Sequence, residues 1–220
     1  MRFIAVINVL SRVLLLFAAS MVLPWGISFL LGDGAERAFG WSLAATLLAA
    51  TASGAFQLQA ALSVRSAAAE LSSTFVRARA YALTRGVAVA LKFRRDGGRY
   101  EWALYRDGNG NGVRTSEIAS GVDRSLALAV PWSRTDVRPG ILLGTPVPDP
   151  SSSGAQLDRL DDPIRFNNSD LCSFSPTGES TPGSVYLWDG RDRMAVVRVY
   201  GRSAKVRTLF HFRGEKDWRK

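Results

Sequence analysis

The sequence predicts an α+β fold in which a long N-terminal helix packs on an antiparallel β-sheet, preceded by one or two transmembrane helices. Three observations lead to this prediction. Most of the first sixty residues are apolar, residues 64–82 carry an apolar stripe at helical spacing, and residues 87–93 alternate as a strand does. One helix followed by many short strands is typical of an α+β domain.

Residues 1–58 are predicted to form a membrane anchor. Residues 13–31 are uncharged and apolar, close to the roughly 20 residues that a spanning helix needs. A polar turn at 32–37 and an alanine-rich, uncharged stretch at 38–58 predict a helical hairpin over 5–31 and 38–58. A cleaved signal peptide is the main alternative for the first helix, but no small-residue cleavage site directly follows its apolar core.

The following segment is predicted to be a helix with one buried face. Its apolar residues are three or four apart, as in one stripe of an α-helix, at Val64, Ala68, Leu71, Phe75, Ala78 and Ala82. Gly86 is expected to end the helix, because glycine adopts a left-handed C-terminal turn without steric cost. This helix opens a second predicted domain, residues 59–220.

Strands are expected throughout the rest of that domain. Residues 87–106 form a predicted hairpin that turns at Asp96-Gly97-Gly98. Further strands are expected as a meander at 125–130, 140–144, 164–166, 171–174, 185–188, 194–200 and 205–212. The last two flank residues 201–204 and are expected to pair as a hairpin.

No motif in the sequence indicates catalysis, a cofactor or a metal site. Asp107 opens a run that resembles a calcium loop, but Ile118 stands where that pattern requires glutamate, so a tight polar turn is favoured. Cys172 is the one cysteine and is expected to be buried, and the one histidine, His211, is expected to be structural. The acidic run 158–162 is interpreted as a surface loop. We therefore predict a protein that is not an enzyme.

Four segments in order resemble the soluble domain of pseudopilins of the general secretion protein H and FimT type, over residues 62–213. They are the helix and strand around Arg77–Gly86, the Asp107–Gly112 loop, the turn Phe174–Gly178 and the late hairpin at Gly201-Arg202. The resemblance implies a minor structural subunit of a type II secretion system or a type IV pilus. It also implies other pseudopilins or pilus assembly proteins as partners, and a place in the bacterial inner membrane with the head in the periplasm.

The N-terminal region departs from this family. Such prepilins carry Gly-Phe-Thr-Leu-Ile-Glu before a long apolar helix, and the nearest match here, Gly54–Gln59, lacks the glutamate. Residues 1–50 instead resemble the first helical hairpin of Trk-type potassium uptake proteins, which is interpreted as an anchor alone. Basic residues flank the predicted hairpin, so two spans would place the head in the cytoplasm and one span in the periplasm.

The formal net charge of +9 and the pI near 10.4 predict attraction to anionic surfaces. The FimT-type resemblance implies a DNA-binding alternative through the basic C-terminal hairpin. The candidate residues are Arg198, Arg202, Lys205, Arg207 and Arg213. A solvated edge strand, on which basic residues prevent aggregation, explains the same pattern without a ligand.

Overall fold

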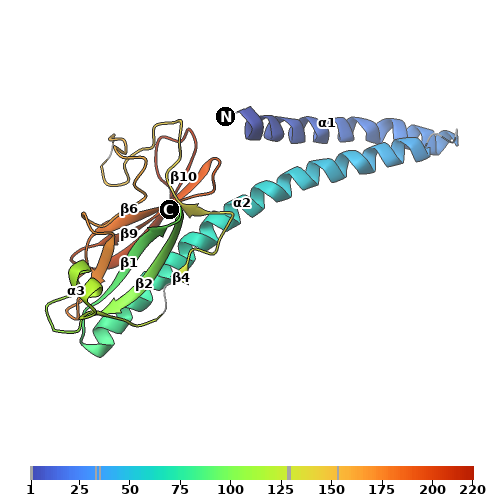
Figure 1. Ribbon diagram of the computed structural model, residues 1–220. Helices are drawn as coiled ribbons and strands as arrows, with labels where there is room; N and C mark the ends of the chain where they lie inside the picture. The colour runs from blue at the N-terminus through green and yellow to red at the C-terminus, as the bar shows by residue number, and fades with distance from the viewer. Residues whose placement is uncertain (1, 33, 35, 128–129, 153) are drawn as a thin grey trace. The chain divides into compact units, whose positions relative to one another are not determined.

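The computed structural model describes residues 2–32, 34, 36–127, 130–152 and 154–220, without the side chains of residues 2–12, 36 and 51–58 (Figure 1). The chain divides into two compact units, Met1–Ala61 and Leu62–Lys220. Helix α2 (Glu36–Arg85) contributes residues to both units.

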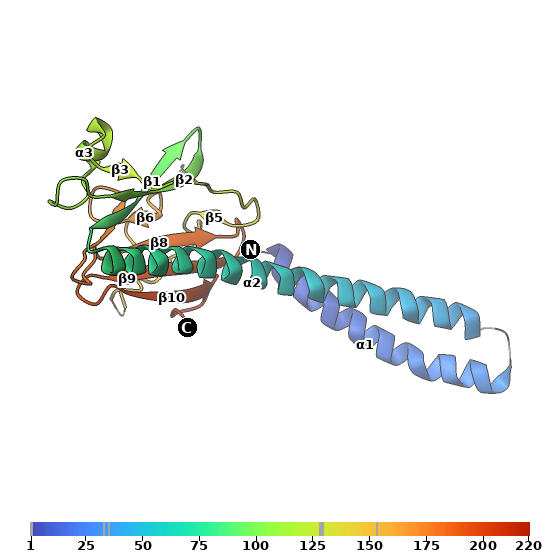
Figure 2. The same cartoon turned by 90° about the horizontal axis from the view of Figure 1, so that it is seen from below.

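The first unit consists of α1 (Arg2–Leu31) and the beginning of α2, which run antiparallel (Figure 2). Residues Val13–Leu31 of α1 have a mean hydropathy of 2.1 and are long and apolar enough to cross a membrane. Among the described residues this is the one helix that meets both criteria. The predicted second span, residues 38–58, is helical and continues into the rest of α2 without a helix end. It includes residues 51–58, whose side chains are not among those that the structure describes.

In the second unit, α2 packs one face against the sheets as the apolar stripe predicted. Val64, Ala68, Leu71, Phe75, Ala78 and Ala82 are all buried. The helix ends at Arg85, and Gly86 has a φ of 64°, a left-handed conformation that favours glycine. The amide of Val87 donates to the carbonyl of Ala82, which satisfies one of the last helical acceptors. The predicted helix and its end are confirmed.

The first sheet has five strands in the order β3-β2-β1-β7, with β4 also pairing with β2. The strands are β1 (Val89–Asp96), β2 (Arg99–Arg106), β3 (Arg124–Ser125), β4 (Val130–Pro131) and β7 (Leu171–Phe174). Asp96 pairs with Arg99, so Gly97 and Gly98 alone make the turn of the predicted hairpin. Both glycines have positive φ, as a two-residue hairpin turn requires.

The second sheet also has five strands, in the order β10-β9-β8-β5, with β6 also pairing with β8. The strands are β5 (Arg138–Pro139), β6 (Ile164–Arg165), β8 (Gly183–Trp188), β9 (Arg193–Tyr200) and β10 (Lys205–Phe212). The predicted β9–β10 hairpin is confirmed, with Tyr200 opposite Lys205.

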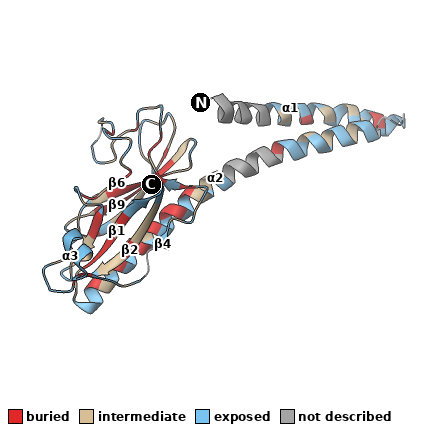
Figure 3. Cartoon of the chain, in the orientation of Figure 1, coloured by how far each residue is buried: buried red, intermediate tan, exposed pale blue. Residues whose placement is uncertain are grey.

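Both sheets share one core with α2, and buried residues follow the inner faces of all three elements (Figure 3). Phe75 is fully buried, and its ring centroid lies 6.2 Å from that of Phe93, 5.9 Å from that of Phe166 and 6.3 Å from that of Phe174. Cys172 is fully buried in the same core, as predicted. These contacts join α2 to strands that are far apart in the sequence.

The predicted meander is wrong, because β7 pairs with β1 across a long connection and so creates two sheets. The predicted strand at 140–144 is also wrong. Only Arg138 and Pro139 pair with β8, and Ile141 and Leu142 then enter a second core cluster on the outer face of the second sheet. The predicted strand at 125–130 is divided into β3 and β4, with residues 128–129 outside the described part of the chain.

Candidate functional site

The β9–β10 hairpin brings three of the five candidate DNA-binding residues onto one face of the second sheet. Arg198 lies directly opposite Arg207, and Lys205 lies opposite Tyr200. Successive residues of a strand point to opposite faces, so Arg198, Tyr200, Lys205 and Arg207 share a face. We call these four residues the basic face. Val197, Val199 and Val206 point the other way, toward the core shared with α2.

The basic face holds like charges side by side. The guanidinium carbons of Arg198 and Arg207 lie 5.4 Å and 5.6 Å from the centroid of the Tyr200 ring. Like charges directly opposite each other on a sheet destabilise it, and an aromatic ring offsets only part of that repulsion. Among the described residues, no carboxylate forms an ion pair with Arg198, Lys205 or Arg207. The basic face is therefore suited to an anionic ligand.

Arg207 and Arg198 belong to a row of laterally paired residues that continues across the second sheet beyond the hairpin. Arg198 is opposite Ser184 of β8, and Ser184 is opposite Arg165 of β6. Tyr186, on the same face of β8, is buried, and burial raises its pKa to about 12, although the nearby charges of Arg165 and Arg198 act to lower it. The tyrosine thus stays protonated at neutral pH and adds no negative charge to the row.

Arg165 was missed in the sequence because its place beside β8 comes from long-range strand pairing, which no local pattern reveals. Its guanidinium forms an ion pair with Asp158 at 3.0 Å and donates to the carbonyl oxygens of Asp162 and Arg159. It also stacks over the Tyr186 ring at 5.3 Å. Arg165 therefore fixes the 158–162 loop and offers less charge to a ligand than Arg198 or Arg207.

The other two candidate residues, Arg202 and Arg213, lie at opposite ends of the hairpin. Arg202 is exposed in the turn between β9 and β10, next to the basic face. Arg213 follows the opposite end of β10, where its Nε lies 2.5 Å from Asp192 and its other nitrogens donate to Leu143, Thr145 and Arg191. Arg213 thus links the end of β10 to residues 143–145 and 191–192 through hydrogen bonds, and it does not belong to the basic face.

The polar loop after β2 satisfies its own hydrogen bonds. Asp107 accepts from the amides of Asn109, Gly110 and Gly112 at 2.7–3.0 Å. Burial raises the pKa of Asp107, but these backbone donors outweigh that effect and hold it below its usual value. Glu117 belongs to the short helix α3 (Thr115–Ser120), which no pattern in the sequence predicted. It accepts a hydrogen bond from the side-chain amide of Asn111 at 2.8 Å. These contacts describe a self-contained polar turn, as predicted.

A metal site would require several of the remaining acidic, cysteine and histidine residues to lie together. Within the described residues, no cluster of three or more histidine, cysteine, aspartate or glutamate side chains could hold a metal ion. Of the acidic run 158–162, Asp158 pairs with Arg165 and Asp162 with Arg159. His211 is buried against Trp218, with 5.1 Å between the ring centroids.

The architecture is α+β, with one long helix packed against the antiparallel sheets of the head. An apolar helix precedes that head in the sequence. The chain belongs to the GspH family, because the sequence model of the family described as type II transport protein GspH matches residues 67–202, more than half of the chain. The predicted resemblance to pseudopilins of the general secretion protein H type is confirmed. The resemblance of residues 1–50 to Trk-type proteins stays a prediction.

Two solved structures of one protein are similar to this chain. They are a crystal structure and a further structure of the minor pseudopilin EpsH from the type II secretion system of Vibrio cholerae, with TM-scores of 0.38 and 0.36 and sequence identities of 12% and 14%. Each match covers 70% of this chain, and 96% or 99% of the EpsH chain. No curated protein matches the sequence.

Proposed function

We propose that the protein is a minor pseudopilin of a type II secretion system, a structural subunit without catalytic activity. The family match over residues 67–202 carries this proposal. Its role is to add a folded head to an assembly of other pseudopilins in the bacterial inner membrane. A role in a type IV pilus is the alternative within the same structural class.

Helix α1 supports the membrane anchorage. Val13–Leu31 spans 19 residues, close to the roughly 20 that cross the hydrocarbon core. Leu23 lies near the middle of this segment and is 69% exposed, whereas Leu30 lies at its end and is 84% exposed. An arginine near the centre of a span costs about 2.5–3.5 kcal/mol of insertion free energy. Leu23→Arg should therefore shift protein from the membrane to the soluble fraction, and Leu30→Arg should do so much less.

The exposed side of α2 supports assembly with other subunits. Leu62, Val76 and Leu83 are 56%, 53% and 45% exposed, and they are spaced by seven or fourteen residues along the helix. Ala69, also exposed, fills the remaining seventh position. Apolar residues at every seventh position lie along one line on the surface of a helix, as they do where two helices pack together. We call this line of residues the seam. We propose that this seam packs against a helix of a neighbouring pseudopilin.

The head is proposed to face the periplasm, with α1 as a single span and the basic N-terminal residues Arg2 and Arg12 on the cytoplasmic side. Alkaline phosphatase, which is active only outside the cytoplasm, tests this when fused after Lys220 and, separately, after Gly34. Both fusions should be active. An active Gly34 fusion with an inactive Lys220 fusion would mean two spans and a cytoplasmic head, which excludes the secretion role.

The basic face supports DNA binding as a second candidate function. Together with Arg202, the basic face presents four cations. Each phosphate contact contributes about −0.9 to the slope of the logarithm of the binding constant against the logarithm of the salt concentration. Four such contacts predict a slope of about −3.6. A mobility-shift assay of the full chain in detergent should show this slope, and Arg198→Ala with Arg207→Ala should reduce it by about half. The control is Arg114→Ala with Arg124→Ala, which removes two exposed arginines elsewhere. Equal loss of affinity in both double variants would refute a specific site.

A further inference from the structure

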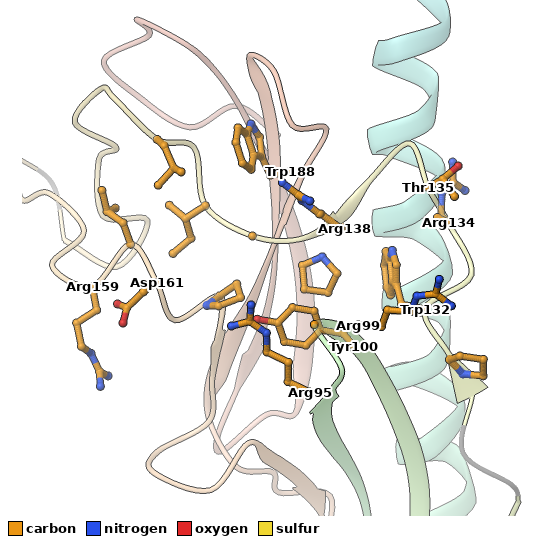
Figure 4. A pocket seen from close by; sticks show the side chains of 18 of the residues that line it. Arg95, Arg99, Tyr100, Trp132, Arg134, Thr135, Arg138, Arg159, Asp161 and Trp188 are labelled. Carbon is orange, nitrogen blue, oxygen red and sulfur yellow. The ribbon is translucent and has the colours of Figure 1, made fainter.

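A second basic site lies away from the basic face, in a cleft of about 1210 Å³ between the two sheets (Figure 4). Three separate segments line it. They are the tip of the β1–β2 hairpin, the 131–143 segment and the 158–163 loop, with Trp188 of β8 beside them. No assembly or DNA-binding role proposed above uses this cleft.

The lining has an excess of positive charge. It carries five arginines and two aspartates, Asp158 and Asp161. Asp158 is already paired with Arg165, while Arg159 is paired with Asp162 and Arg134 with Asp136. Among the described residues, no carboxylate forms an ion pair with Arg95, Arg99 or Arg138. Within the described part of the chain, three guanidinium groups in one concave surface therefore have no ion-pair partner.

Aromatic rings hold two of these guanidinium groups in place. Arg95 lies 5.7 Å from the centroid of the Tyr100 ring, and Arg138 lies 5.7 Å from that of Trp188. Figure 4 shows Arg95 beside Tyr100 and Arg138 beside Trp188 on facing sides of the cleft. Stacking on a ring leaves the edge of the guanidinium, with its N–H donors, available to a carboxylate. The arginines are thus partly ordered before any ligand binds, which lowers the entropic cost of binding.

The backbone of the 131–143 segment is also fixed. β4 pairs with β2 at its beginning and β5 pairs with β8 further on, so the segment joins the edges of both sheets. The Trp132 amide donates to the Tyr100 carbonyl at 2.8 Å, and the Trp132 indole donates to the Val137 carbonyl. Arg134 donates to Ser66 of α2 at 3.2 Å. The cleft is therefore a built surface and not a gap between loose loops.

Its size and lining indicate the kind of ligand. Small-molecule sites usually measure about 300–1,000 Å³, so this cleft exceeds that range and is open to a longer ligand. Apolar side chains from Ile141, Leu143 and Leu160 line it together with the arginines. Leu143 is 55% exposed there. Such a surface matches a chain that carries both carboxylates and apolar side chains, whereas a nucleic-acid backbone would leave the apolar part unused.

We infer that this cleft binds an extended acidic segment of a partner protein, whose carboxylates bind Arg95, Arg99 and Arg138 and whose apolar side chains contact Trp188 and Leu143. Arginine and carboxylate form bidentate, charge-assisted hydrogen bonds, which fix the register of the segment. The inference concerns a site separate from the seam on α2 and from the basic face.

The test uses the full chain in detergent micelles and fluorescence anisotropy of three labelled probes. The first probe is a peptide that alternates glutamate with leucine, the second has lysine in place of each glutamate, and the third is oligothymidine. The acidic peptide should bind, and Arg95→Ala with Arg138→Ala should weaken it about tenfold or more, since a hydrogen bond to a charged group contributes about 1.5–3 kcal/mol. The matched control, Arg114→Ala with Arg124→Ala, removes two exposed arginines that line neither the cleft nor the basic face, and it should leave peptide binding unchanged.

Three results would overturn the inference. They are no binding of the acidic peptide, equal binding of the acidic and lysine peptides, and equal weakening by the two double variants. Binding of oligothymidine that is lost in Arg95→Ala with Arg138→Ala would assign the cleft to nucleic acid instead. Retained far-UV circular dichroism of each variant establishes that it is folded. Failure here leaves the α1 and α2 tests of the proposed pseudopilin role unaffected, because none of those variants touches the cleft.

Discussion

Phe75→Ala should destabilise the head more than any change on the exposed side of α2. The Phe75 side chain is fully buried, and three phenylalanine rings surround it with centroids 5.9–6.3 Å away. These rings come from β1, from the residue after β6 and from β7, so one side chain connects the helix to both sheets. Its removal leaves a cavity that several rigid elements line.

The expected loss is about 4 kcal/mol, because Phe→Ala in a core costs about 3–5 kcal/mol and the ring–ring contacts place this site in the upper half of that range. Small domains have only about 5–15 kcal/mol of unfolding free energy, so the variant should unfold at much lower denaturant. The assay is a urea titration of the full chain in detergent, followed by far-UV circular dichroism.

Val76→Ala is the matched control, since Val76 is the next residue of the same helix and is 53% exposed. Its expected cost is about 0.5 kcal/mol or less. A loss below about 1 kcal/mol for Phe75→Ala, or equal losses in the two variants, would refute the assignment of this helix face to the shared core.

Three further changes test the polar contacts of the head. Asp107→Asn should cost about 2 kcal/mol of unfolding free energy at neutral pH, because it weakens charge-assisted bonds to three loop amides. The folded pKa of Asp107 is lowered, so this contribution to stability is present above the unfolded pKa and is lost as pH falls through the folded pKa. Urea titrations at several pH values measure this dependence. Burial lowers the pKa of His211, while the Asp217 backbone and Glu215 act in the other direction. Stability should therefore fall as pH drops below about 6.5, and His211→Phe should flatten this dependence. Arg213→Ala should cost about 3 kcal/mol in thermal or urea unfolding, because it leaves Asp192 partly buried without its ion pair, yet it should leave the salt slope of DNA binding unchanged.

Local features of the sequence predicted the elements that depend on neighbouring residues. The stripe from Val64 to Ala82, the left-handed Gly86 and the Gly97-Gly98 turn each determine the conformation of a short segment, and all three are as predicted. The β9–β10 hairpin is equally local.

Long-range pairing could not be predicted in the same way. β7 pairs with β1, whose residues lie 79–85 positions earlier in the sequence, and β6 places Arg165 in the row with Arg198 through β8. The pairing partner of a strand depends on packing over the whole core, which alternation within the strand does not encode. For the same reason, the sequence does not reveal the cleft, whose lining comes from three separate segments. It also placed Arg213 with the hairpin cations, whereas its ion pair with Asp192 removes it from them.

Site-specific photo-crosslinking in cells of the organism that produces the protein tests the proposed pseudopilin role most directly. A photoreactive amino acid replaces Val76, an exposed residue of the seam on α2, or Arg114, an exposed residue far along the chain in the loop before α3. We predict a crosslinked product with another pseudopilin from position 76 and none from position 114. No product from position 76, or the same products from both positions, would contradict assembly through this helix.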